Sequence, residues 1–539
     1  MDEDDNSINL ASEDRAEVSD SASLENATNL LFPENDDLEV DGNVVAIPEM
    51  LSLKGKQLTS IPSKLYQFTN LKVLDISHNS ITSIPSKIAA FSQIRQLLLN
   101  KNKISELPTA IGQLITLEKL SLKINQLTTL PETIARLKNL CVLNLDYNRI
   151  FVFPRAICLL PELKKLSLSG NSLQSLPMEI SELKNLRELS LNDNKLTFLP
   201  LQCFDLDNLE ELRLSGNQLT SLSEKIEKLQ ALRILQLKNN QLQELPNELS
   251  NCVRIKQLLL DGNQITDLPS RIGNLYNMTE FCASKNELKT LPMGLSHVTY
   301  LSILDISYNM VEQIPIELKN CFRVTSINFS HNNLSQFPAA LCLITELKYL
   351  NLSGNHVSEL LADVCCMRNL ENLNLSANNF TSFPVHVCKL WNMDHLDLSK
   401  NRIGSIPVQI SALLNLQVLY LQNNQFNTFC YNLCRLTNLK RLDISSNQIE
   451  NLPWDILNLQ NIVDLNFSDN HFDLFPIQIC HLTTLRKLQI CQLNGFKVRT
   501  LPSTTIIEII FTESCWSMNG LPQEVVEAEA TALFFKGNG

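Results

Sequence analysis

The sequence predicts an α/β solenoid, a stack of about twenty short coils of 23 residues that share one parallel β-sheet on a concave face. Two observations predict this fold. Eighteen asparagines recur every 23 residues from Asn79 to Asn470, without an insertion or a deletion. Around each of them the same apolar frame returns, written LxxLxLxxNxLxxLPxxIxxLxxL. A constant period of this length indicates one supersecondary unit copied end to end, so we expect a curved horseshoe or superhelix rather than several globular domains.

The first half of the unit predicts a short strand. In the frame around Asn79 the apolar residues Leu71, Leu74 and Ile76 step by three and then by two, so the last pair has the alternation of a strand. An asparagine amide both donates and accepts hydrogen bonds. We therefore expect each of the eighteen asparagines to end its strand and to bond the backbone of a neighbouring coil.

The second half of the unit predicts the convex side. A proline follows the asparagine by six residues at fifteen of the eighteen positions. Proline donates no backbone hydrogen bond, so this stretch is not a central strand. Apolar residues nine and twelve positions after the asparagine, such as Ile88 and Phe91, predict a short helical, 3-10 or extended segment that turns its apolar side inward.

Both ends of the array depart from the frame. One period before Asn79, Lys56 takes the place of the asparagine. After Asn470 the frame begins once more at Leu485, but its proline arrives at Pro502, three residues late. We expect three regions: an acidic disordered tail of residues 1–42, a repeat domain of residues 43–502, and a degenerate repeat or capping segment of residues 503–539.

Charge is concentrated in the tail. Residues 1–42 hold fourteen Asp or Glu and one Arg, a net charge of −13, which leaves 44 basic and 43 acidic residues in the remainder of the chain. An acidic tail repels nucleic acid and anionic membranes. It is either a solubilising leader or an arm that docks on a basic partner, with the apolar run that starts at Leu30 as its anchor.

Eight of the fifteen cysteines lie at two fixed positions of the repeat. Cys158, Cys342, Cys365, Cys388, Cys434 and Cys480 lie ten residues after their asparagine, and Cys252 and Cys321 lie twelve after. These positions predict small core residues. No cysteine precedes Leu51, no run of about 18 apolar residues spans a bilayer, and the chain starts with acidic residues, so we expect a monomeric cytoplasmic protein without membrane insertion.

Catalysis is not expected. A side chain that recurs once per coil does not gather a nucleophile, a base and a metal in one pocket, and we expect neither a metal nor a cofactor. Glycines such as Gly170 and Gly262 lie beside the asparagine and serve the turn. The enzymatic alternative is a ligase that uses Cys515, which has no His or Asp within residues 505–525.

The concave face predicts a binding surface. The strand residue four positions before the asparagine points outward, and in the last eight coils this column holds seven Asp or Asn and one Tyr. Serine recurs two positions before the asparagine, for example at Ser307 and Ser330, and predicts a floor of hydroxyl groups. With the nearby aromatic side chains, the predicted partner-binding residues are Asp305, Tyr308, Asn328, Tyr349, Asn351, Asn374, His395, Asp397, Tyr420, Asp443 and Asn466.

Two interpretations of this column remain open. It favours a basic or donor-rich protein partner, or its side chains only satisfy local backbone groups. Earlier coils mix bases with acids and lack interleaved aromatic residues, as at Lys165, Arg187 and Glu210, which indicates a solvated face and no nucleic-acid groove.

With its 23-residue unit, its Leu-Pro pair and the absence of cysteine caps, the chain resembles the intracellular leucine-rich repeat proteins. Among these it is similar to the Ras-group scaffolds of the Shoc/Sur type and to the repeat domains of Erbin and Scribble. The resemblance implies a non-catalytic platform in signalling, on which a small GTPase or a phosphatase subunit assembles. The Shoc/Sur leader is lysine-rich, whereas this one is acidic. The alternative is a recognition receptor or an enzyme inhibitor with one tight protein partner.

Overall fold

The structure of the protein, a computed structural model, describes residues 49–472, 476–490 and 508–510. The chain divides into two compact units, residues 1–212 and 213–539. The predicted acidic tail of residues 1–42 and most of the predicted capping segment of residues 503–539 lie outside the described residues, as does Cys515.

Both units are built from the same coil, which consists of a three-residue strand, a turn and a 3-10 helix. In the coil of β5 (Val142–Asn144) and η5 (Arg155–Leu159), Leu143 is buried while Val142 and Asn144 point to the other face of the sheet. Pro154 stands at the N-terminal cap of η5 in an extended conformation, because its ring fixes φ and it has no N–H to leave unpaired. The predicted convex segment is therefore a 3-10 helix.

In the first unit the strands are β1 (Met50–Ser52), β2 (Val73–Asp75), β3 (Gln96–Leu98), β4 (Lys119–Ser121), β5, β6 (Lys165–Ser167) and β7 (Glu188–Ser190), and β8 (Glu211–Arg213) spans the boundary in the sequence. The 3-10 helices are η1 (Ser63–Gln67), η2 (Ser86–Ala90), η3 (Thr109–Gln113), η4 (Glu132–Arg136), η5, η6 (Met178–Glu182) and η7 (Leu201–Asp205).

In the second unit the strands are β9 (Ile234–Gln236), β10 (Gln257–Leu259), β11 (Glu280–Cys282), β12 (Ile303–Asp305), β13 (Ser326–Asn328), β14 (Tyr349–Asn351), β15 (Asn372–Asn374), β16 (His395–Asp397), β17 (Val418–Tyr420), β18 (Arg441–Asp443), β19 (Asp464–Asn466), β20 (Lys487–Gln489) and β21 (Glu508–Ile510). The 3-10 helices are η8 (Glu224–Lys228), η9 (Asn247–Asn251), η10 (Ile272–Asn274), η11 (Met293–His297), η12 (Ile316–Asn320), η13 (Ala339–Leu343), η14 (Ala362–Cys366), η15 (Val385–Lys389), η16 (Val408–Ala412), η17 (Tyr431–Arg435), η18 (Trp454–Asn458) and η19 (Ile477–His481).

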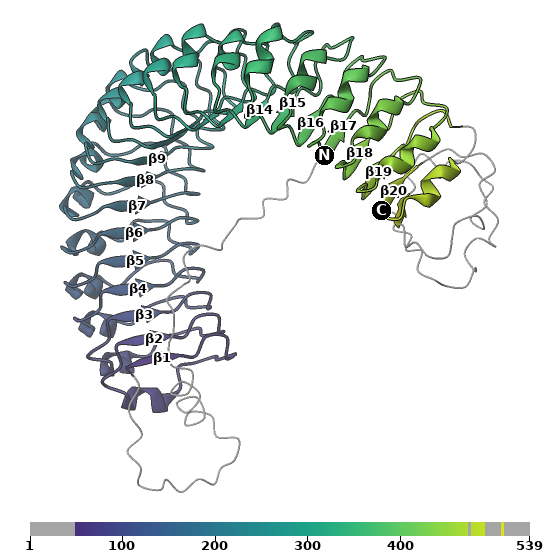
Figure 1. Cartoon of the computed structure of the whole chain (residues 1–539). Coiled ribbons are helices and arrows are strands. Elements are labelled where there is room, and N and C mark those ends of the chain that lie inside the picture. Colours follow the sequence, from purple (N-terminus) through teal and green to yellow (C-terminus); the bar gives the residue numbers. More distant parts are fainter. Residues whose placement is uncertain (1–48, 473–475, 491–507, 511–539) are drawn as a thin grey trace, which may run out of the picture. The chain divides into compact units, whose positions relative to one another are not determined.

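Within each unit, successive strands pair in parallel with a register of one period. Leu74 of β2 lies opposite Leu97 of β3, and Leu304 of β12 lies opposite Ile327 of β13. Figure 1 shows the strands of the second unit on its inner side and the 3-10 helices on its outer side. Residues at the same position of successive coils therefore form columns, and each column runs along one face.

The core of each coil is formed by the apolar residues of the frame. In the coil of β2 and η2, Leu71, Leu74, Ile76, Ile88 and Phe91 have no solvent exposure at all. One coil alone would leave these side chains in contact with water on two sides. Their burial requires the neighbouring coil above and below, so the stacked array, and not the single coil, is the stable structure.

The recurring asparagines, which we call the ladder asparagines, join neighbouring coils as predicted. Asn148 Nδ2 donates to the carbonyl of Leu145 in its own coil at 2.9 Å and to that of Leu122 in the preceding coil at 3.0 Å. Its Oδ1 accepts from the backbone N–H of Leu127, also in the preceding coil, at 3.0 Å. The same contacts, 3, 26 and 21 residues back, recur at Asn79 and Asn470.

The residue before the ladder asparagine has a positive φ in coil after coil. Glycine occupies this position at Gly170 and Gly354, but Tyr308, Ile124 and twelve other residues without glycine's freedom also have φ between 50° and 58° there. The left-handed conformation costs about 1–2 kcal/mol for an ordinary residue. The repeated turn thus overrides local preference, because the asparagine contacts fix the backbone on both sides.

The cysteines of the repeat mostly pack as predicted. Cys158, Cys342, Cys388 and Cys434 are buried, and Cys252 and Cys321 are fully buried. Cys365 is an exception, because it is only half-buried, and the side chain of Cys480 lies outside the described part. Burial raises the pKa of Cys158 and Cys252 to about 12, so these thiols are neutral core groups.

We predict that Asn263→Ala destabilises the protein by about 1–3 kcal/mol, because the carbonyl groups of Leu237 and Leu260 and the N–H of Leu242 lose their partner inside the stack. Lys56 holds the equivalent position in the first coil and is exposed, so Lys56→Ala should change the stability by less than about 0.5 kcal/mol. Denaturation in urea, followed by circular dichroism, measures both. Equal losses would contradict the stacking role of the ladder.

We predict that Ile124→Asn stabilises the protein by about 1 kcal/mol, because a β-branched residue at φ 57° is strained and asparagine tolerates this conformation. Asn239 and Asn423 already occupy the equivalent position in other coils. Ile115→Asn, at an exposed site outside the left-handed turns, is the matched control and should give no gain. A lower melting temperature for Ile124→Asn than for the unchanged protein would refute the strain argument.

Candidate functional site

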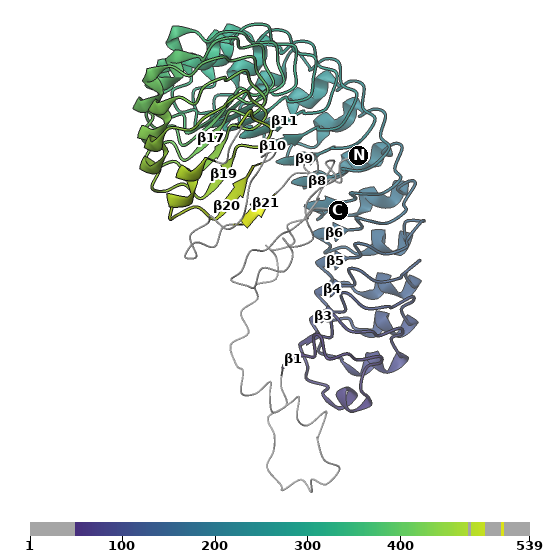
Figure 2. The same cartoon turned by 90° about the vertical axis from the view of Figure 1, so that its right-hand side faces the viewer.

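The strand face of the second unit, meaning the side of β9 to β20 that points away from the leucine core, carries the predicted binding column. Figure 2 shows β17, β19 and β20 on this face. The column residues stand at the third position of each strand and are half-buried, among them Asp305, Asn351, Asp397 and Tyr420. The predicted column therefore lies on the strand face, but its side chains are less exposed than the sequence suggested.

Each Asp or Asn of the column binds its own turn. Asp305 Oδ1 accepts from the backbone N–H of Ser307 at 2.9 Å and from its hydroxyl at 2.7 Å. The equivalent backbone contact recurs at Asn328, Asn351, Asn374, Asp397, Asp443 and Asn466, with distances of 2.9–3.1 Å. One oxygen of each of these seven Asp and Asn side chains is thus used within the fold, as in an Asx turn.

The predicted floor of serine hydroxyls is mostly buried, and only Ser284 and Ser376 of its serines are half-exposed. Ser307, Ser330, Ser353, Ser399, Ser445 and Ser468 are all buried, with 3–7% of their surface exposed. The sequence placed them beside the column at strand spacing, but the chain has already turned away from strand geometry at this position. The hydroxyls of Ser307, Ser445 and Ser468 donate to the Asp or Asn of the column in their own coil, so they serve the local turn.

The second polar atom of each Asp or Asn side chain has a hydrogen-bond partner at the two ends of the column but not at its centre. Asn328 Nδ2 donates to Asp305 Oδ2 at 3.1 Å, and Asn466 Nδ2 donates to Asp443 Oδ2 at 2.9 Å, so these pairs satisfy each other. Among the described residues, Nδ2 of Asn351, Nδ2 of Asn374 and Oδ2 of Asp397 have no such partner. The atoms that remain available to a ligand lie on β14, β15 and β16.

Aromatic side chains lie beside these atoms. Tyr349 on β14 is 36% exposed. The rings of His395 on β16 and Tyr420 on β17 meet edge to face, with centroids 5.4 Å apart. The Tyr420 hydroxyl accepts from Arg441 Nη1 at 3.0 Å, and Arg441 Nε pairs with Asp464 at 3.1 Å. Tyr420 is therefore held in one orientation, which lowers the entropy cost of binding a partner on it.

Tyr308 does not belong to this group. It lies in the turn before the ladder asparagine, not on β12, and its φ is 52°. Its ring stacks on that of His331 with a centroid distance of 4.2 Å, and the His331 ring in turn lies over Gly354, where an added Cβ would come within 2.5 Å of it. Tyr308 and His331 form a separate exposed stack at the edge of the sheet.

Burial shifts two ionisable groups of the site. It raises the pKa of the Asp397 carboxyl, against the hydrogen bonds from Ser399 and the positive charges nearby. It also lowers the pKa of His395, against the opposing charges of Asp397 and Asp394. The site at neutral pH therefore presents a neutral imidazole next to a carboxylate.

A groove that the sequence interpretation missed adjoins the start of these strands. It has a volume of about 720 Å³ and is lined by Glu371, Asn392, Asp394, Asn415, Gln417, Asn438, Lys440 and Asn461. Four of these are asparagines nine residues before a ladder asparagine, and each donates Nδ2 to a carbonyl 24 residues back, as Asn415 does to Trp391 at 2.9 Å. Their Oδ1 atoms remain as acceptors. The sequence signal for this groove is an asparagine that recurs nine residues before the ladder asparagine, at Asn392, Asn415, Asn438 and Asn461.

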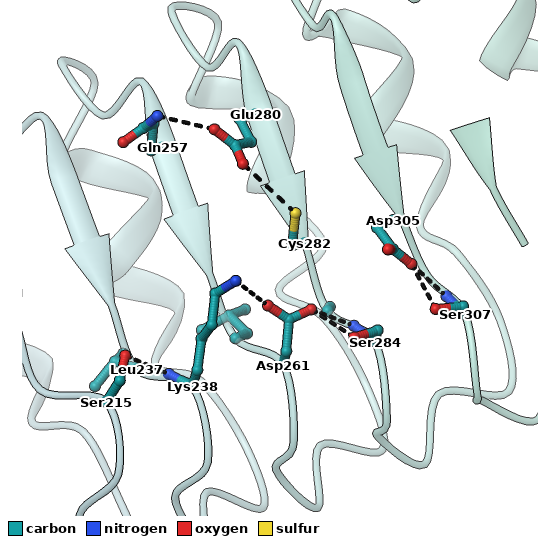
Figure 3. A network of polar contacts seen from close by, with 12 residues as sticks. Ser215, Leu237, Lys238, Gln257, Asp261, Glu280, Cys282, Ser284, Asp305 and Ser307 are labelled. Atoms are coloured by element: carbon teal, nitrogen blue, oxygen red, sulfur yellow. Dashed lines mark hydrogen bonds and ion pairs between the residues drawn. The ribbon is translucent and has the colours of Figure 1, made fainter. Parts of the chain in front are cut away.

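At the start of the second unit the strand face has a different chemistry (Figure 3). Lys238 Nζ pairs with Asp261 Oδ2 at 2.9 Å, and Asp261 Oδ1 accepts from the N–H and hydroxyl of Ser284 in the next coil. Cys282 takes the column position and is 9% exposed. These polar groups satisfy one another across coils, so this part of the face offers a partner fewer free donors and acceptors than β14 to β16.

In the first unit, charges of opposite sign pair across neighbouring strands. Lys165 Nζ pairs with Glu188 at 2.6 Å and Arg187 Nη1 with Glu210 at 3.2 Å. The basic partners are exposed and the two carboxylates are half-buried, so solvent screens these pairs and they contribute little stability. Acidic and basic side chains are thus mixed along this face, as the sequence predicted.

Within the described ranges, no three His, Cys, Asp or Glu side chains group closely enough to hold a metal ion. The described 3-10 helices, three to five residues long, are too short to cross a lipid bilayer.

Comparison with known proteins agrees with this architecture. Models of the leucine-rich repeat match residues 49–104, 92–150, 115–173, 161–219 and 207–265, a further model of a leucine-rich repeat region matches residues 316–447, and a single-repeat model matches residues 438–459. A leucine-rich repeat protein of Leptospira interrogans is 33% identical over 76% of this chain and 92% of its own, with a TM-score of 0.55. The chain belongs to the leucine-rich repeat family. None of the matching models describes a catalytic family.

Two further structures show the same fold. The plant peptide hormone receptor RGFR1, solved in complex with RGF2, is 25% identical over 86% of this chain and 90% of its own, with a TM-score of 0.63. YopM from Yersinia enterocolitica is 23% identical over 82% of this chain and 91% of its own, with a TM-score of 0.56. A search of curated proteins found no match.

We predict that His395→Gln weakens the dependence of stability on pH. Because the pKa of His395 is lowered in the folded state, its neutral form stabilises the fold above the unfolded pKa of about 6.5, and this contribution is lost as the pH falls through the folded pKa. The free energy of unfolding, measured in urea at pH 7.5 and pH 5.0, should therefore decrease less in the variant than in the unchanged protein. An identical decrease would show that His395 titrates alike in both states.

Proposed function

We propose that this leucine-rich repeat protein is a non-catalytic scaffold of the cytoplasm that binds a protein partner on the strand face of its second unit. The observation that carries the proposal is the group of polar atoms on β14, β15 and β16 that have no partner among the described residues, next to Tyr349, His395 and Tyr420. Interfaces are enriched in such aromatic side chains surrounded by polar groups. Leucine-rich repeats commonly serve as protein-interaction modules, and the residues that differ between coils provide the specificity.

The chemistry of the site indicates the kind of partner. Asp397 offers a free carboxylate oxygen, and the adjoining groove adds Glu371, Asp394 and a row of asparagine Oδ1 acceptors. Lys348 Nζ pairs with Glu371 at 3.1 Å, while Asp394 has no ion pair among the described residues. Acceptors outnumber donors here, so the site suits a donor-rich or basic surface of a partner protein.

The resemblance to the Ras-group scaffolds narrows the proposal to signalling. On that ground, a small GTPase or a phosphatase subunit is the proposed partner of a monomeric platform, and the acidic residues 1–42 are a candidate arm for a basic region of the same assembly. Recovery of partners with and without residues 1–42 tests the arm. Identical inventories would remove it from the proposal.

We predict that the triple variant Tyr349→Ser, Asn351→Asp and Asp397→Asn loses most partner recovery, by about tenfold or more. The two Asx exchanges keep the Oδ1 that caps Ser353 and Ser399, so the turns remain while the atom that faces a partner changes from donor to acceptor or the reverse. Affinity capture with the full chain, followed by quantitative mass spectrometry, measures the loss.

The matched control is Asp75→Asn, which makes the same exchange at the same column position in the first unit, where Asp75 Oδ1 also caps its own turn at Ser77. It should leave recovery unchanged. If the folded triple variant recovers the same partners in the same amounts, the assignment of the site to β14–β17 is wrong.

A second candidate is a recognition receptor or inhibitor with one tight partner. It is favoured by the similarity to RGFR1, which was solved with a bound peptide hormone. The two functions differ in their effect on the partner. A scaffold leaves the activity of the captured enzyme intact, whereas an inhibitor abolishes it at stoichiometric concentration.

A further inference from the structure

The outer side of the second unit carries an apolar column that the fold does not require. It consists of the seventh residue after the ladder asparagine in nine consecutive coils, from Met293 to Ile477 in steps of 23, and we call it the apolar stripe. Every member is apolar or aromatic, with alanine at Ala339 and Ala362. In the ten preceding coils the same position is Ser, Thr, Glu, Arg or Asn in eight, the exceptions being Met178 and Leu201.

The stripe is exposed. Met293 is 64% exposed, Tyr431 and Trp454 are each 58% exposed, and Ile477 is 50% exposed. The core of these coils is provided by the residues two and five positions later, such as Ile456 and Leu459, which are fully buried. Large apolar side chains that line up in water without a role in the core indicate an interaction surface.

The spacing of the stripe fits an α-helix. One stripe residue occurs per coil, neighbouring strands lie about 4.8 Å apart, and the outer side is spaced at least as widely. An α-helix that lies along the stripe presents one side chain per turn of about 5.4 Å on the same face. Each turn of such a helix meets one coil. An extended strand does not match, because residues on one of its faces recur at about 6.6 Å and the strands of this sheet are already paired.

Unpaired carboxylates flank the stripe. Three of them, Glu312, Glu359 and Glu450, lie three or four residues before a stripe residue. Three others, Glu317, Asp363 and Asp455, directly follow a stripe residue. None of the six has an ion pair among the described residues, whereas the strand-face carboxylates Glu371 and Asp464 do. Basic side chains are fewer at these flanking positions, where only Lys289 and His386 occur. Three further bases, Lys319, Lys389 and Arg435, lie three or four residues after a stripe residue in the 3-10 helices.

We propose that the apolar stripe is a second interaction surface, which binds an amphipathic α-helix of a partner protein with Lys or Arg residues beside its apolar face. The stripe buries the apolar face of the helix, and the flanking carboxylates pair with its bases. The acidic flank disfavours an anionic membrane, and a second copy of the chain would place like surfaces against each other. This surface is separate from the strand-face site, so the protein holds two partners at once.

The probe is a fluorescein-labelled 18-residue peptide of Leu and Lys with the period of an amphipathic helix, titrated with the full chain and followed by fluorescence anisotropy. Tyr431→Ser with Trp454→Ser should weaken its binding by about 30-fold, the size of an interface hot spot. The matched control is Met178→Ser with Leu201→Ser, which makes the same kind of change at the same position in two adjacent coils, where the side chains are 65% and 58% exposed. It should change the affinity by less than about twofold.

Charge is tested separately. Glu450→Gln with Asp455→Asn should weaken binding of the Leu/Lys peptide at low salt, and the difference should shrink in about 1 M salt, where the Debye length is about 3 Å. A Leu/Glu peptide of the same pattern, and a scrambled Leu/Lys peptide of the same composition, should not bind. The side chains changed in all variants are exposed in the structure, and circular dichroism is used to check that each variant folds.

Four results would overturn the proposal. They are equal affinity of the stripe variant and the unchanged protein, equal binding of the scrambled peptide, stripe-dependent binding of anionic vesicles without binding of the peptide, and a concentration-dependent dimer in sedimentation velocity that the stripe variant abolishes. The third result would assign the stripe to a membrane and the fourth to a second copy of the chain.

Discussion

One side-chain amide per coil determines the geometry of the array. A ladder asparagine such as Asn148 has a donor that reaches two carbonyl groups and an acceptor that takes one N–H, all at the point where the backbone leaves the sheet. Aspartate lacks the donor and leucine lacks both groups. These backbone groups are buried, so a missing partner would leave them unsatisfied at a cost of about 1–3 kcal/mol. Because the partners lie 21 and 26 residues earlier, the coil keeps a length of 23 residues, and all other columns follow from this constant register.

The fold was predictable because its determinants are local and repeated. The apolar frame predicts the strand and the core, the asparagine predicts the turn, and the proline six residues later predicts the convex segment. The structure has a strand, a turn and a 3-10 helix at these places. The position of Tyr308 was less predictable. Its sequence position suggested the sheet, but the left-handed turn places it at the edge, where it stacks on His331.

The site was predictable only as a column, not as a set of available atoms. In the sequence Asp305 and Asn351 are equivalent, since both stand four residues before a ladder asparagine and both cap their own turn. They differ because Asn328 donates to the second oxygen of Asp305, while the amide nitrogen of Asn351 has no such neighbour in the described structure. The difference depends on rotamers and on contacts between coils, which a repeat frame does not contain. The seventh position after the ladder asparagine varies between coils and is not part of the repeat frame, so the frame does not predict the apolar stripe that begins at Met293.

The reach of the ladder asparagine also has a consequence for how such a protein changes over time. Each asparagine bonds only its own coil and the one before it, so no contact in the stack records the total number of coils. Loss or duplication of a whole coil leaves every ladder contact intact, whereas an insertion of any other length interrupts one. Loss or duplication of a whole coil shortens or lengthens the columns on both faces by one residue each. A surface built from columns, such as the one centred on β14 to β16, is therefore lengthened or shortened one whole coil at a time, while the columns of the two faces keep their alignment.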